Sequence, residues 1–379
     1  MHVLIVPRSY PNKLNPVSGI FFQQQVTELE KEFNVGVLAY LNLSLKQRFS
    51  KRFWKTGPSW NKNKMLFFSI AVPFLKAVSM WLRFVALKQQ FRVYSKKFGR
   101  PDLVHVHCAE AGAVAIWIKK NYGIPYLVTE HLSRMYKANL PAYYTSVVKA
   151  VYEEAESRIA VSSGFAEVLE NHFNLPFRVI PNMVDCDFFS LKEKSTDEKT
   201  INTIQVGGLN KNKNHAAVIL AVKMMLDKGY NLYHTIIGEG EERKTLEKLI
   251  SDVKINDHVH LAGQGSRAQV RDALHKADFF ISSSHKETFG VVMIEAMCCG
   301  LPVLSTKTNG AMDLIHEGEN AYLCEPDSKS LCDGMVKMLQ HDWKPREIRE
   351  NVVKNFSAEV VIGELKREYK KIVGNGLDD

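Results

Sequence analysis

Strand-like and helix-like segments alternate along almost the whole chain, and this alternation restricts the fold more than any other feature. Short apolar runs such as His2–Val6 and Ile201–Val206 precede longer segments with a helical apolar period, such as Gly19–Glu32 and His215–Lys228. Strands separated by helices favour parallel sheets, because a parallel connection needs a crossover long enough to hold a helix. The sequence therefore predicts an α/β fold built on doubly wound parallel sheets.

The alternation is interrupted once, near the middle of the chain. The stretch 185–200 ends in a polar, charged run whose composition is typical of a linker. A chain of 379 residues is also too long for one ordinary hydrophobic core. We therefore predict an N-terminal domain at 1–184, a linker at 185–200 and a C-terminal domain at 201–356. The amphipathic helix within 357–379 is expected to cross back to the first domain.

Composition indicates a soluble globular protein that stays in the cytoplasm. The apolar run Met1–Pro7 has no basic region before it and no cleavage site after it, so it is predicted to be a buried strand rather than a signal peptide. The six cysteines have no metal-type spacing, which favours free thiols. The triplet Asp185-Cys186-Asp187 is interpreted as a turn. We expect neither a metal site nor a cofactor.

Positive charge is concentrated in one segment. Positions 33–101 contain fourteen lysines and arginines and no acidic residue, whereas the whole chain has a net charge of +9. Aromatic residues are interleaved with these charges, and the apolar run Met65–Leu75 is too short to span a bilayer. We therefore predict that residues 46–100 contact the anionic inner face of the cell membrane peripherally. An ordinary solvated face is the main alternative, and nucleic-acid binding lacks a recognisable module.

Two glutamates flank the predicted start of a helix. Glu287 lies in the loop before Gly290, and Glu295 lies just over one turn inside the helix. The free amides of Phe289, Gly290 and Val291 can bind a phosphate, and the glycine lets a ligand approach the backbone closely. The carboxylates can accept hydrogen bonds from hydroxyls on either side. A sugar nucleotide requires this combination of groups.

Several motifs together resemble those of the retaining glycosyltransferases of family four. The segment from Ser284 through Glu287, Phe289 and Gly290 to Gly300 and Pro302 is similar to the family signature. Further similar motifs are Val206-Gly-Gly-Leu209-x3-Lys213, Ile237-Gly238-Glu-Gly240, Ile180-Pro-Asn182-x-Val-Asp185, Thr306-x2-Asn309-Gly310-x2-Asp313 and Gly318-x-Asn320-x-Tyr322. The match covers nearly the whole chain. It implies the GT-B fold, in which two Rossmann-like domains face one another.

The resemblance implies roles for residues of the C-terminal domain. Glu287 would accept hydrogen bonds from the donor sugar and face its anomeric carbon, and Glu295 would bind both ribose hydroxyls. Lys213 would stabilise the leaving diphosphate beside the glycines Gly207 and Gly208. The family usually has an arginine at the position of Gly208, so the diphosphate must be anchored differently here.

The resemblance also implies roles for two residues of the N-terminal domain. The loop that ends at Gly19 is expected to touch the β-phosphate or the acceptor. His131 would contact the donor sugar and the reacting centre, where it stabilises the site or moves a proton. His105 and His107 alternate on the preceding strand and are expected to be packing residues.

The predicted function is that of a cytoplasmic, membrane-associated, retaining and metal-independent glycosyltransferase. It would transfer a sugar from a UDP- or GDP-linked donor to a lipid-linked glycan in surface polysaccharide assembly. The alternatives are a sugar-nucleotide epimerase or hydrolase on the same fold and a non-catalytic polyanion-binding protein. A nicotinamide-dependent oxidoreductase would need a glycine fingerprint that the chain lacks. The sequence does not specify the sugar, the base, the acceptor, the linkage or the oligomeric state.

Overall fold

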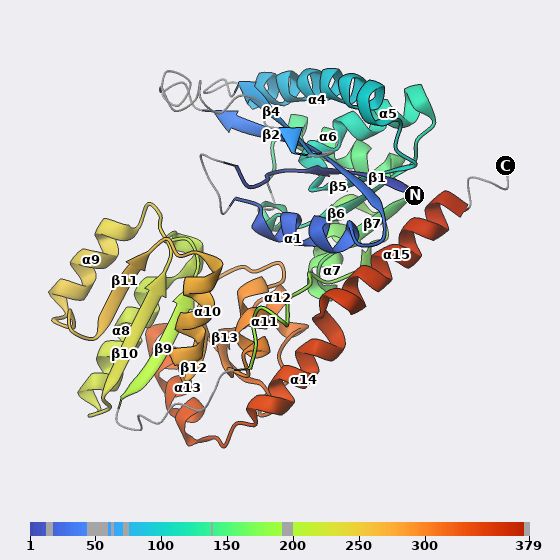
Figure 1. Ribbon diagram of the computed structural model, residues 1–379. Coiled ribbons are helices and arrows are strands. Elements are labelled where there is room, and N and C mark those ends of the chain that lie inside the picture. The colour runs from blue at the N-terminus through green and yellow to red at the C-terminus, as the bar shows by residue number, and fades with distance from the viewer. Residues whose placement is uncertain are drawn as a thin grey trace. The chain divides into compact units, whose positions relative to one another are not determined.

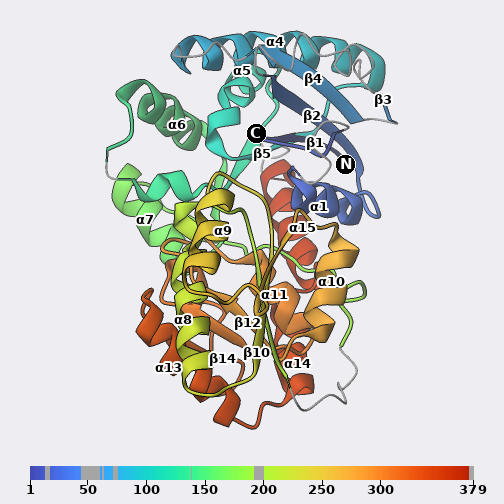
Figure 2. The ribbon, with the colours of Figure 1, turned by 90° about the vertical axis from the view of Figure 1, so that its left-hand side faces the viewer.

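The protein forms two compact units, each built on its own sheet (Figures 1 and 2). The computed structural model describes residues 1–12, 18–43, 60–61, 64–70, 76–137, 139–191 and 200–374. The first unit contains Met1–Val161, Ala166–Ile180 and the residues from Ile362 onward, and the second contains Ser162–Phe165 and Pro181–Val361. Positions 192–199, within the predicted linker, lie outside the described residues.

The first unit holds a sheet in the order β3-β4-β2-β1-β5-β6-β7-β8, in which β3 pairs with β4 in antiparallel and the other described pairs are parallel. Its strands are β1 (His2–Pro7), β2 (Asn34–Leu43), β3 (Trp60–Asn61), β4 (Lys64–Ile70), β5 (Leu103–His107), β6 (Tyr126–Glu130), β7 (Ser157–Ala160) and β8 (Arg178–Val179). Its helices are α1 (Ile20–Leu29), α4 (Lys76–Phe98), α5 (Ala113–Tyr122), α6 (Ala142–Glu154), α7 (Ser163–Phe173) from Ala166 onward and the end of α15 (Ala358–Gly374).

The three central strands of this sheet are covered on both faces. Every residue of β1, β5 and β6 is buried. A parallel strand with helices on both sides needs apolar residues at successive positions rather than at alternate ones. The continuous apolar run at the start of the chain is therefore a central strand.

The basic segment contains a strand, β4, that the sequence did not predict. Strand β4 pairs with β2 in parallel, from Val37 opposite Lys64 to Leu43 opposite Ile70, and α4 begins only at Lys76. Apolar and aromatic residues in an unbroken short run favour a strand over a helix. Within the predicted membrane-contact segment 46–100, positions 46–59, 62–63 and 71–75 lie outside the described residues.

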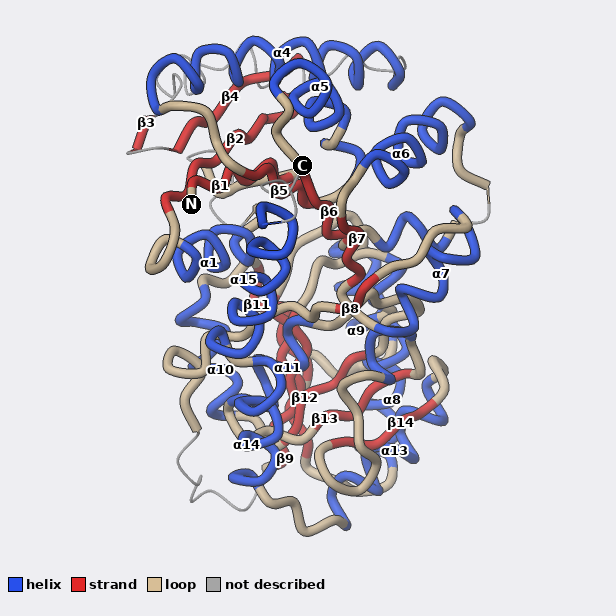
Figure 3. The backbone as a smooth tube through the Cα atoms, turned by 90° about the vertical axis from the view of Figure 1, so that its right-hand side faces the viewer, coloured by secondary structure: helices blue, strands red, loops and turns tan. Residues whose placement is uncertain are grey.

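The second unit holds an entirely parallel sheet in the order β11-β10-β9-β12-β13-β14 (Figure 3). Its strands are β9 (Ile201–Val206), β10 (Leu232–Ile237), β11 (Val259–Gly263), β12 (Phe279–Ser282), β13 (Val303–Thr306) and β14 (Ala321–Cys324). Its helices are α8 (His215–Asp227), α9 (Arg243–Asp252), α10 (Arg267–Lys276), α11 (Val291–Cys298), α12 (Asn309–Met312), α13 (Ser328–Gln340), α14 (Pro345–Phe356) and the start of α15.

The strand order of this sheet reverses between β9 and β12. The chain proceeds outward from β9 through β10 to β11, and then returns to place β12 on the other side of β9. In doubly wound folds, ligands bind beyond the carboxyl ends of the strands at such a switch point. The predicted α/β class with two doubly wound sheets is confirmed. No helix within the described ranges has both the length and the apolar content needed to cross a membrane.

Candidate functional site

The loops after β9 and β12 meet at the switch point and bring together two residues that are far apart in the sequence. The Lys213 Nζ atom lies 2.7 Å from Oε2 of Glu287. Both side chains are partly exposed, at 29% and 18% respectively. The Ser284 hydroxyl also donates to Oε2 of Glu287, at 3.4 Å. A positive and a negative group therefore stand side by side at the edge where a ligand is expected.

Gly207 leaves room for the lysine. A Cβ atom built at Gly207 would lie 3.2 Å from Cε of Lys213, so the aliphatic part of the lysine crosses directly over the glycine. The neighbouring loop approaches still more closely, because a Cβ at Gly238 would lie 1.8 Å from the Gly207 carbonyl oxygen. The two glycines thus allow two strand ends and a lysine side chain to share one small volume.

Gly208 occupies the position at which the resemblance implies an arginine, and the segment that follows it contains Asn210, Lys213 and His215. The Gly208 carbonyl forms a 3.3 Å hydrogen bond with Nε2 of His215. The turn that follows is closed by Asn210, whose side chain accepts from the backbone N–H of Lys213 at 3.3 Å. Lys213 is the residue that this loop presents to Glu287, so it can provide positive charge where the arginine is missing.

The loop at 283–290 is held by its backbone as well as by side chains. The Gly310 N–H donates to the Glu287 carbonyl at 2.9 Å. The Ser162 hydroxyl donates to the Thr288 carbonyl at 2.7 Å. These bonds fix the backbone immediately after the Glu287 side chain, which favours a preorganised site over a mobile loop.

Helix α11 begins just after Gly290, as the sequence predicted, and this glycine is in the left-handed conformation. Gly290 has φ +97° and caps the helix that starts at Val291. Phe289, just before it, is buried. The first helix bond runs from the Met293 N–H to the Gly290 carbonyl. The amino end of a helix carries partial positive charge, so it can bind an anion beside Lys213.

Glu295 lies one turn inside α11 and is partly buried. Burial raises the pKa of its carboxyl group to about 7, and the positive charge of Arg267 acts in the opposite direction. No hydrogen bond joins the carboxylate to any residue in the described ranges. A partly buried acid with a raised pKa and no such bond is typical of a ligand-binding position.

A buried polar network beneath the site was not predicted from the sequence. Gln205 donates from Nε2 to the Ser283 hydroxyl at 2.8 Å, and its Oε1 lies 3.1 Å from Nδ1 of His215 and 3.2 Å from Nε2 of His234. Ser283 in turn donates to the Lys213 carbonyl at 2.7 Å. The network connects the loops after β9 and β12, but its residues lie in two strands, a helix and a loop, so no local motif reveals it.

Gly19 and His131 lie in the first unit. Gly19 has φ +69° at the start of α1, and a Cβ there would lie 2.4 Å from the Ser9 carbonyl oxygen. The backbone conformation therefore requires a glycine at position 19, whether or not this loop binds a ligand. His131 follows β6, and burial lowers its pKa to about 3, so the ring is neutral near pH 7. Its Nε2 lies 3.1 Å from Nδ1 of His107.

The turn that carries His131 is built on a buried acid that the sequence did not single out. The Glu130 carboxylate accepts hydrogen bonds from the N–H groups of His131 and Leu132, each at 2.9 Å. It also accepts from the Tyr152 hydroxyl at 2.7 Å. His105 and His107 are buried as predicted, but His107 also orients the His131 ring, which we had not expected.

The structure brings most of the predicted residues together within the second unit. Gly207, Gly208, Lys213, Glu287, Phe289, Gly290, Val291 and Glu295 all lie in or beside the loops after β9 and β12. The Asp185 triplet forms a turn, as predicted, in which the Phe188 N–H donates to the Asp185 carboxylate at 3.0 Å. Within the described part of the chain, no group of three or more potential ligands is placed to hold a metal ion.

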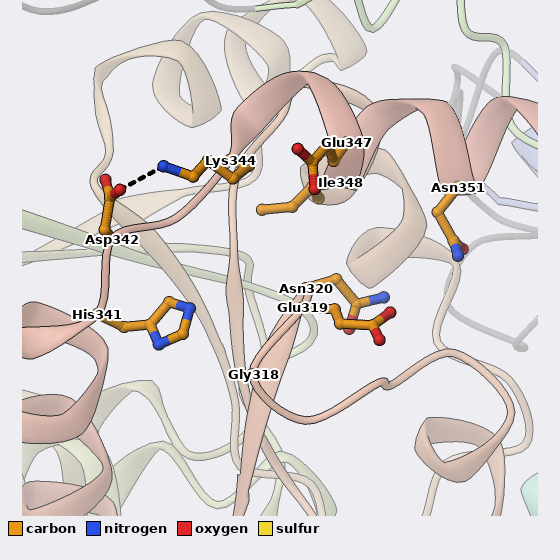
Figure 4. A pocket seen from close by; sticks show the side chains of 9 residues that line it. All are labelled: Gly318, Glu319, Asn320, His341, Asp342, Lys344, Glu347, Ile348 and Asn351. Carbon is orange, nitrogen blue, oxygen red and sulfur yellow. Dashed lines mark hydrogen bonds and ion pairs between the residues drawn. The ribbon is translucent and has the colours of Figure 1, made fainter.

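A hollow in this unit lies at the edge of the sheet opposite the Lys213–Glu287 pair. It has a volume of ≈ 170 Å³ and lies between the loop that precedes β14 and the start of α14 (Figure 4). Its side chains include Glu319, Asp342 and Glu347, and Lys344 forms an ion pair with Asp342. Because Gly318 and its neighbours precede their strand, this hollow is separate from the site around Lys213.

Comparison with known proteins gives two adjacent family matches. The model described as Glycosyl transferases group 1 matches residues 188–355, and the model described as Glycosyltransferase Family 4 matches residues 58–188. The chain is 25% identical over 294 residues to N-acetyl-alpha-D-glucosaminyl L-malate synthase of Bacillus anthracis, covering 72% of this chain and 75% of that protein. It is 23% identical over 401 positions to the Bacillus subtilis protein named "Putative teichuronic acid biosynthesis glycosyltransferase TuaC", covering 98% of this chain and 99% of that protein.

Solved structures show the same architecture. Sucrose-phosphate synthase from Thermosynechococcus elongatus has a TM-score of 0.80 at 17% identity, covering 99% of this chain and 100% of that one. HepE from Anabaena, in complex with UDP, has a TM-score of 0.73 at 17% identity, covering 98% and 100%. At this identity the likeness shows the fold alone, and it confirms the predicted GT-B fold.

Proposed function

Because the chain belongs to the glycosyl transferases of group 1, within family 4, we propose that it is a retaining enzyme that uses a UDP- or GDP-linked sugar. The observation that carries this proposal is the contact between Lys213 and Glu287 beside the amino end of α11. The complex of HepE with UDP supports a nucleotide of this class in the same fold.

Each group at the switch point has a task in the proposed reaction. The diphosphate binds at the amides of Phe289, Gly290 and Val291, and Lys213 stabilises the negative charge that grows as it leaves. Glu287 orients the sugar hydroxyls and stabilises positive charge at the anomeric carbon. Glu295 accepts hydrogen bonds from the ribose. These groups supply anion stabilisation without a metal ion, so we propose a metal-independent reaction.

The bond changes follow from retention of configuration. The bond between the anomeric carbon and the diphosphate oxygen breaks, and the acceptor oxygen bonds to the same face of that carbon. The acceptor proton passes to the leaving phosphate. We propose that neutral His131 hydrogen-bonds the donor sugar and that the loop at Gly19 contacts the β-phosphate or the acceptor. With a pKa of about 3, His131 is suited to hydrogen bonding rather than to carrying a positive charge.

The proposed acceptor is a lipid-linked glycan, which the enzyme reaches from the cytoplasm at the inner face of the membrane. The exposed face of α4 supports this proposal, because Trp81 is 61% exposed and Val78 and Val85 lie on the same helix. Aromatic and apolar side chains on a basic helix favour an anionic bilayer surface. The name of the relative TuaC, which refers to teichuronic acid biosynthesis, is consistent with a polysaccharide product.

A thermal-shift screen with UDP-, GDP- and ADP-sugars tests the donor site. We expect one nucleotide class to stabilise the protein and Glu295→Ala to abolish that stabilisation. Glu319→Ala is the matched control, because Glu319 lies in the hollow at the opposite edge of the sheet. Stabilisation that survives in Glu295→Ala would overturn the site assignment. Full-rate donor turnover without an acceptor would favour the epimerase or hydrolase alternative, and polyanion binding without turnover would favour the binding protein.

A further inference from the structure

Three arginines surround one buried glutamate in the first unit, and we call this group the arginine cage. The Arg8 side chain donates from Nε to Oε1 of Glu110. The Arg134 Nη1 atom lies 3.5 Å from Oε2 of Glu110, and Arg83 Nη1 lies 4.0 Å from Oε1. The Glu110 side chain is only 7% exposed. One carboxylate therefore forms ion-pair contacts with three guanidinium groups.

The cage lies at the edge of the sheet where parallel α/β folds bind ligands. Arg8 directly follows β1, Glu110 lies in the short 3₁₀ helix Ala109–Ala111 after β5, and Arg134 lies in the 3₁₀ helix Ser133–Tyr136 after β6. These three strands are neighbours in the sheet. The cage thus occupies the same carboxyl edge as His131, which also follows β6.

The charges of the cage do not balance. Three guanidinium groups and one carboxylate leave two positive charges. The Arg8 and Arg134 side chains are 40% and 49% exposed. Burial would lower the pKa of Arg8, but the charge of Glu110 outweighs it and raises that pKa, so the group stays protonated. One arginine would already balance the charge of the carboxylate, so the other two leave net positive charge within the cage.

The exposed guanidinium groups also have hydrogen-bond donors to spare. A guanidinium group has five N–H donors in a planar fork. Within the described ranges, the hydrogen bonds of Arg8 and Arg134 side chains all go to Glu110. The Tyr144 hydroxyl donates to Glu110 as well, at 3.3 Å, which helps to hold the carboxylate in place. Glu110 thus orients the guanidinium groups of Arg8 and Arg134, and the N–H groups that do not bond to Glu110 are available to a ligand.

We propose that the arginine cage binds the phosphate group of the acceptor. A phosphate ester carries up to two negative charges, which matches the excess positive charge, and its oxygens accept paired hydrogen bonds from guanidinium groups. The term acceptor rests on the proposed transferase function, whereas the binding of phosphate by the cage does not.

The same helices that contribute to the cage also line an apolar groove. The groove has a volume of ≈ 470 Å³, and its lining includes Trp81 and Phe84 of α4, Trp117 of α5 and Tyr143 of α6. Arg83 precedes Phe84 on α4, and Tyr144 follows Tyr143 on α6. These two residues contact Glu110 of the cage, whereas Phe84 and Tyr143 line the groove. This arrangement is a reason to test a phosphate that carries an alkyl chain beside inorganic phosphate.

Titration calorimetry of the full-length protein tests the proposal. Inorganic phosphate and decyl phosphate, below its micelle concentration, are titrated into wild type, Arg8→Gln and Arg134→Gln. The matched control is Arg178→Gln, because Arg178 is 46% exposed and lies 2.8 Å from the buried Glu368, away from the cage. We expect the affinity for phosphate to fall by roughly tenfold or more in both cage variants, as for loss of a charge-assisted hydrogen bond. The control should bind phosphate with wild-type affinity.

The outcomes separate the source of the phosphate from the existence of the site. Tighter binding of decyl phosphate than of inorganic phosphate supports a lipid acceptor, and equal binding supports a soluble one. Wild-type affinity in both cage variants, or no phosphate binding by wild type, would overturn the proposal. If a glutamine variant fails to fold, Arg134→Lys keeps the charge but removes the fork, and we expect it to show a partial loss of affinity.

A second background keeps this test separate from the donor site, where phosphate can also bind. Lys213→Ala should retain the part of phosphate binding that depends on Arg134. If that part disappears, the signal comes from the donor site and the proposal fails. Conversely, donor turnover that persists while the cage shows no phosphate binding would leave the transferase function intact and refute the cage alone.

Discussion

Glu295 should lower the stability of the protein at neutral and alkaline pH while it serves donor binding. Its folded-state pKa is about 7, compared with an ordinary value of 4.5. An acid whose pKa is raised on folding binds protons more tightly in the folded state. With respect to this group, the folded protein is therefore most stable below pH 4.5, where the carboxyl group is protonated. That stability is lost as the pH rises through about 7 and the partly buried group ionises.

The size of the effect follows from the shift. One pKa unit corresponds to about 1.4 kcal/mol, so ionisation of Glu295 should cost up to about 3 kcal/mol of unfolding free energy above pH 7. Glu295→Gln has nearly the same shape and no charge, so it should escape this cost. We expect the variant to match wild type near pH 4.5 and to be more stable by up to about 3 kcal/mol at pH 8.

Urea unfolding of the full-length protein from pH 4.5 to pH 8 measures this difference, with Glu319→Gln as an exposed control that should show none. The same variant should lose donor affinity roughly tenfold or more, because a neutral amide is a poorer acceptor for two ribose hydroxyls. A stability difference that does not change with pH, or a variant less stable than wild type at pH 8, would refute the reasoning.

Three further predictions concern the groups around the two sites. Gly290→Ala should reduce thermal stability and donor affinity together, because φ is +97° and the new Cβ would lie 2.1 Å from Cε of Met293. His107→Asn should preserve the turnover number better than His107→Phe, since an asparagine amide can replace Nδ1 toward His131 while phenylalanine cannot; equal kinetics of the two variants would contradict an orienting role. Lys213→Ala should lower turnover more than it weakens binding of a neutral sugar analogue, as kinetics and calorimetry would show.

Much of the fold could be predicted because it depends on local patterns. Continuous apolar runs such as His2–Pro7 indicate strands buried on both faces, and the turn at Gly290 has a direct sequence signal. The strand Lys64–Ile70 was missed because it is a short apolar run just before a long helical pattern. Such a run is compatible with a strand and with the first turns of a helix. Local sequence cannot resolve that choice, since the pairing partner Asn34–Leu43 lies far away in the chain.

The site could be predicted only where motifs mark it. Glu287 and Lys213 were identified because both lie in motifs of the family, and the fold then places them 2.7 Å apart. Glu130, Gln205 and the arginines around Glu110 lie outside such motifs. Their functions depend on hydrogen bonds and charges between separate strand ends, which no local pattern encodes.

The most direct test of the central claim is the anomeric configuration of the sugar that the enzyme releases. Proton NMR can follow the slow transfer from an α-linked donor to water, using the donor that the thermal-shift screen identifies. We predict that the α-anomer is released first and that Lys213→Ala reduces its release strongly. Initial release of the β-anomer, or an unchanged rate in Lys213→Ala, would contradict a retaining transfer at the Lys213–Glu287 site.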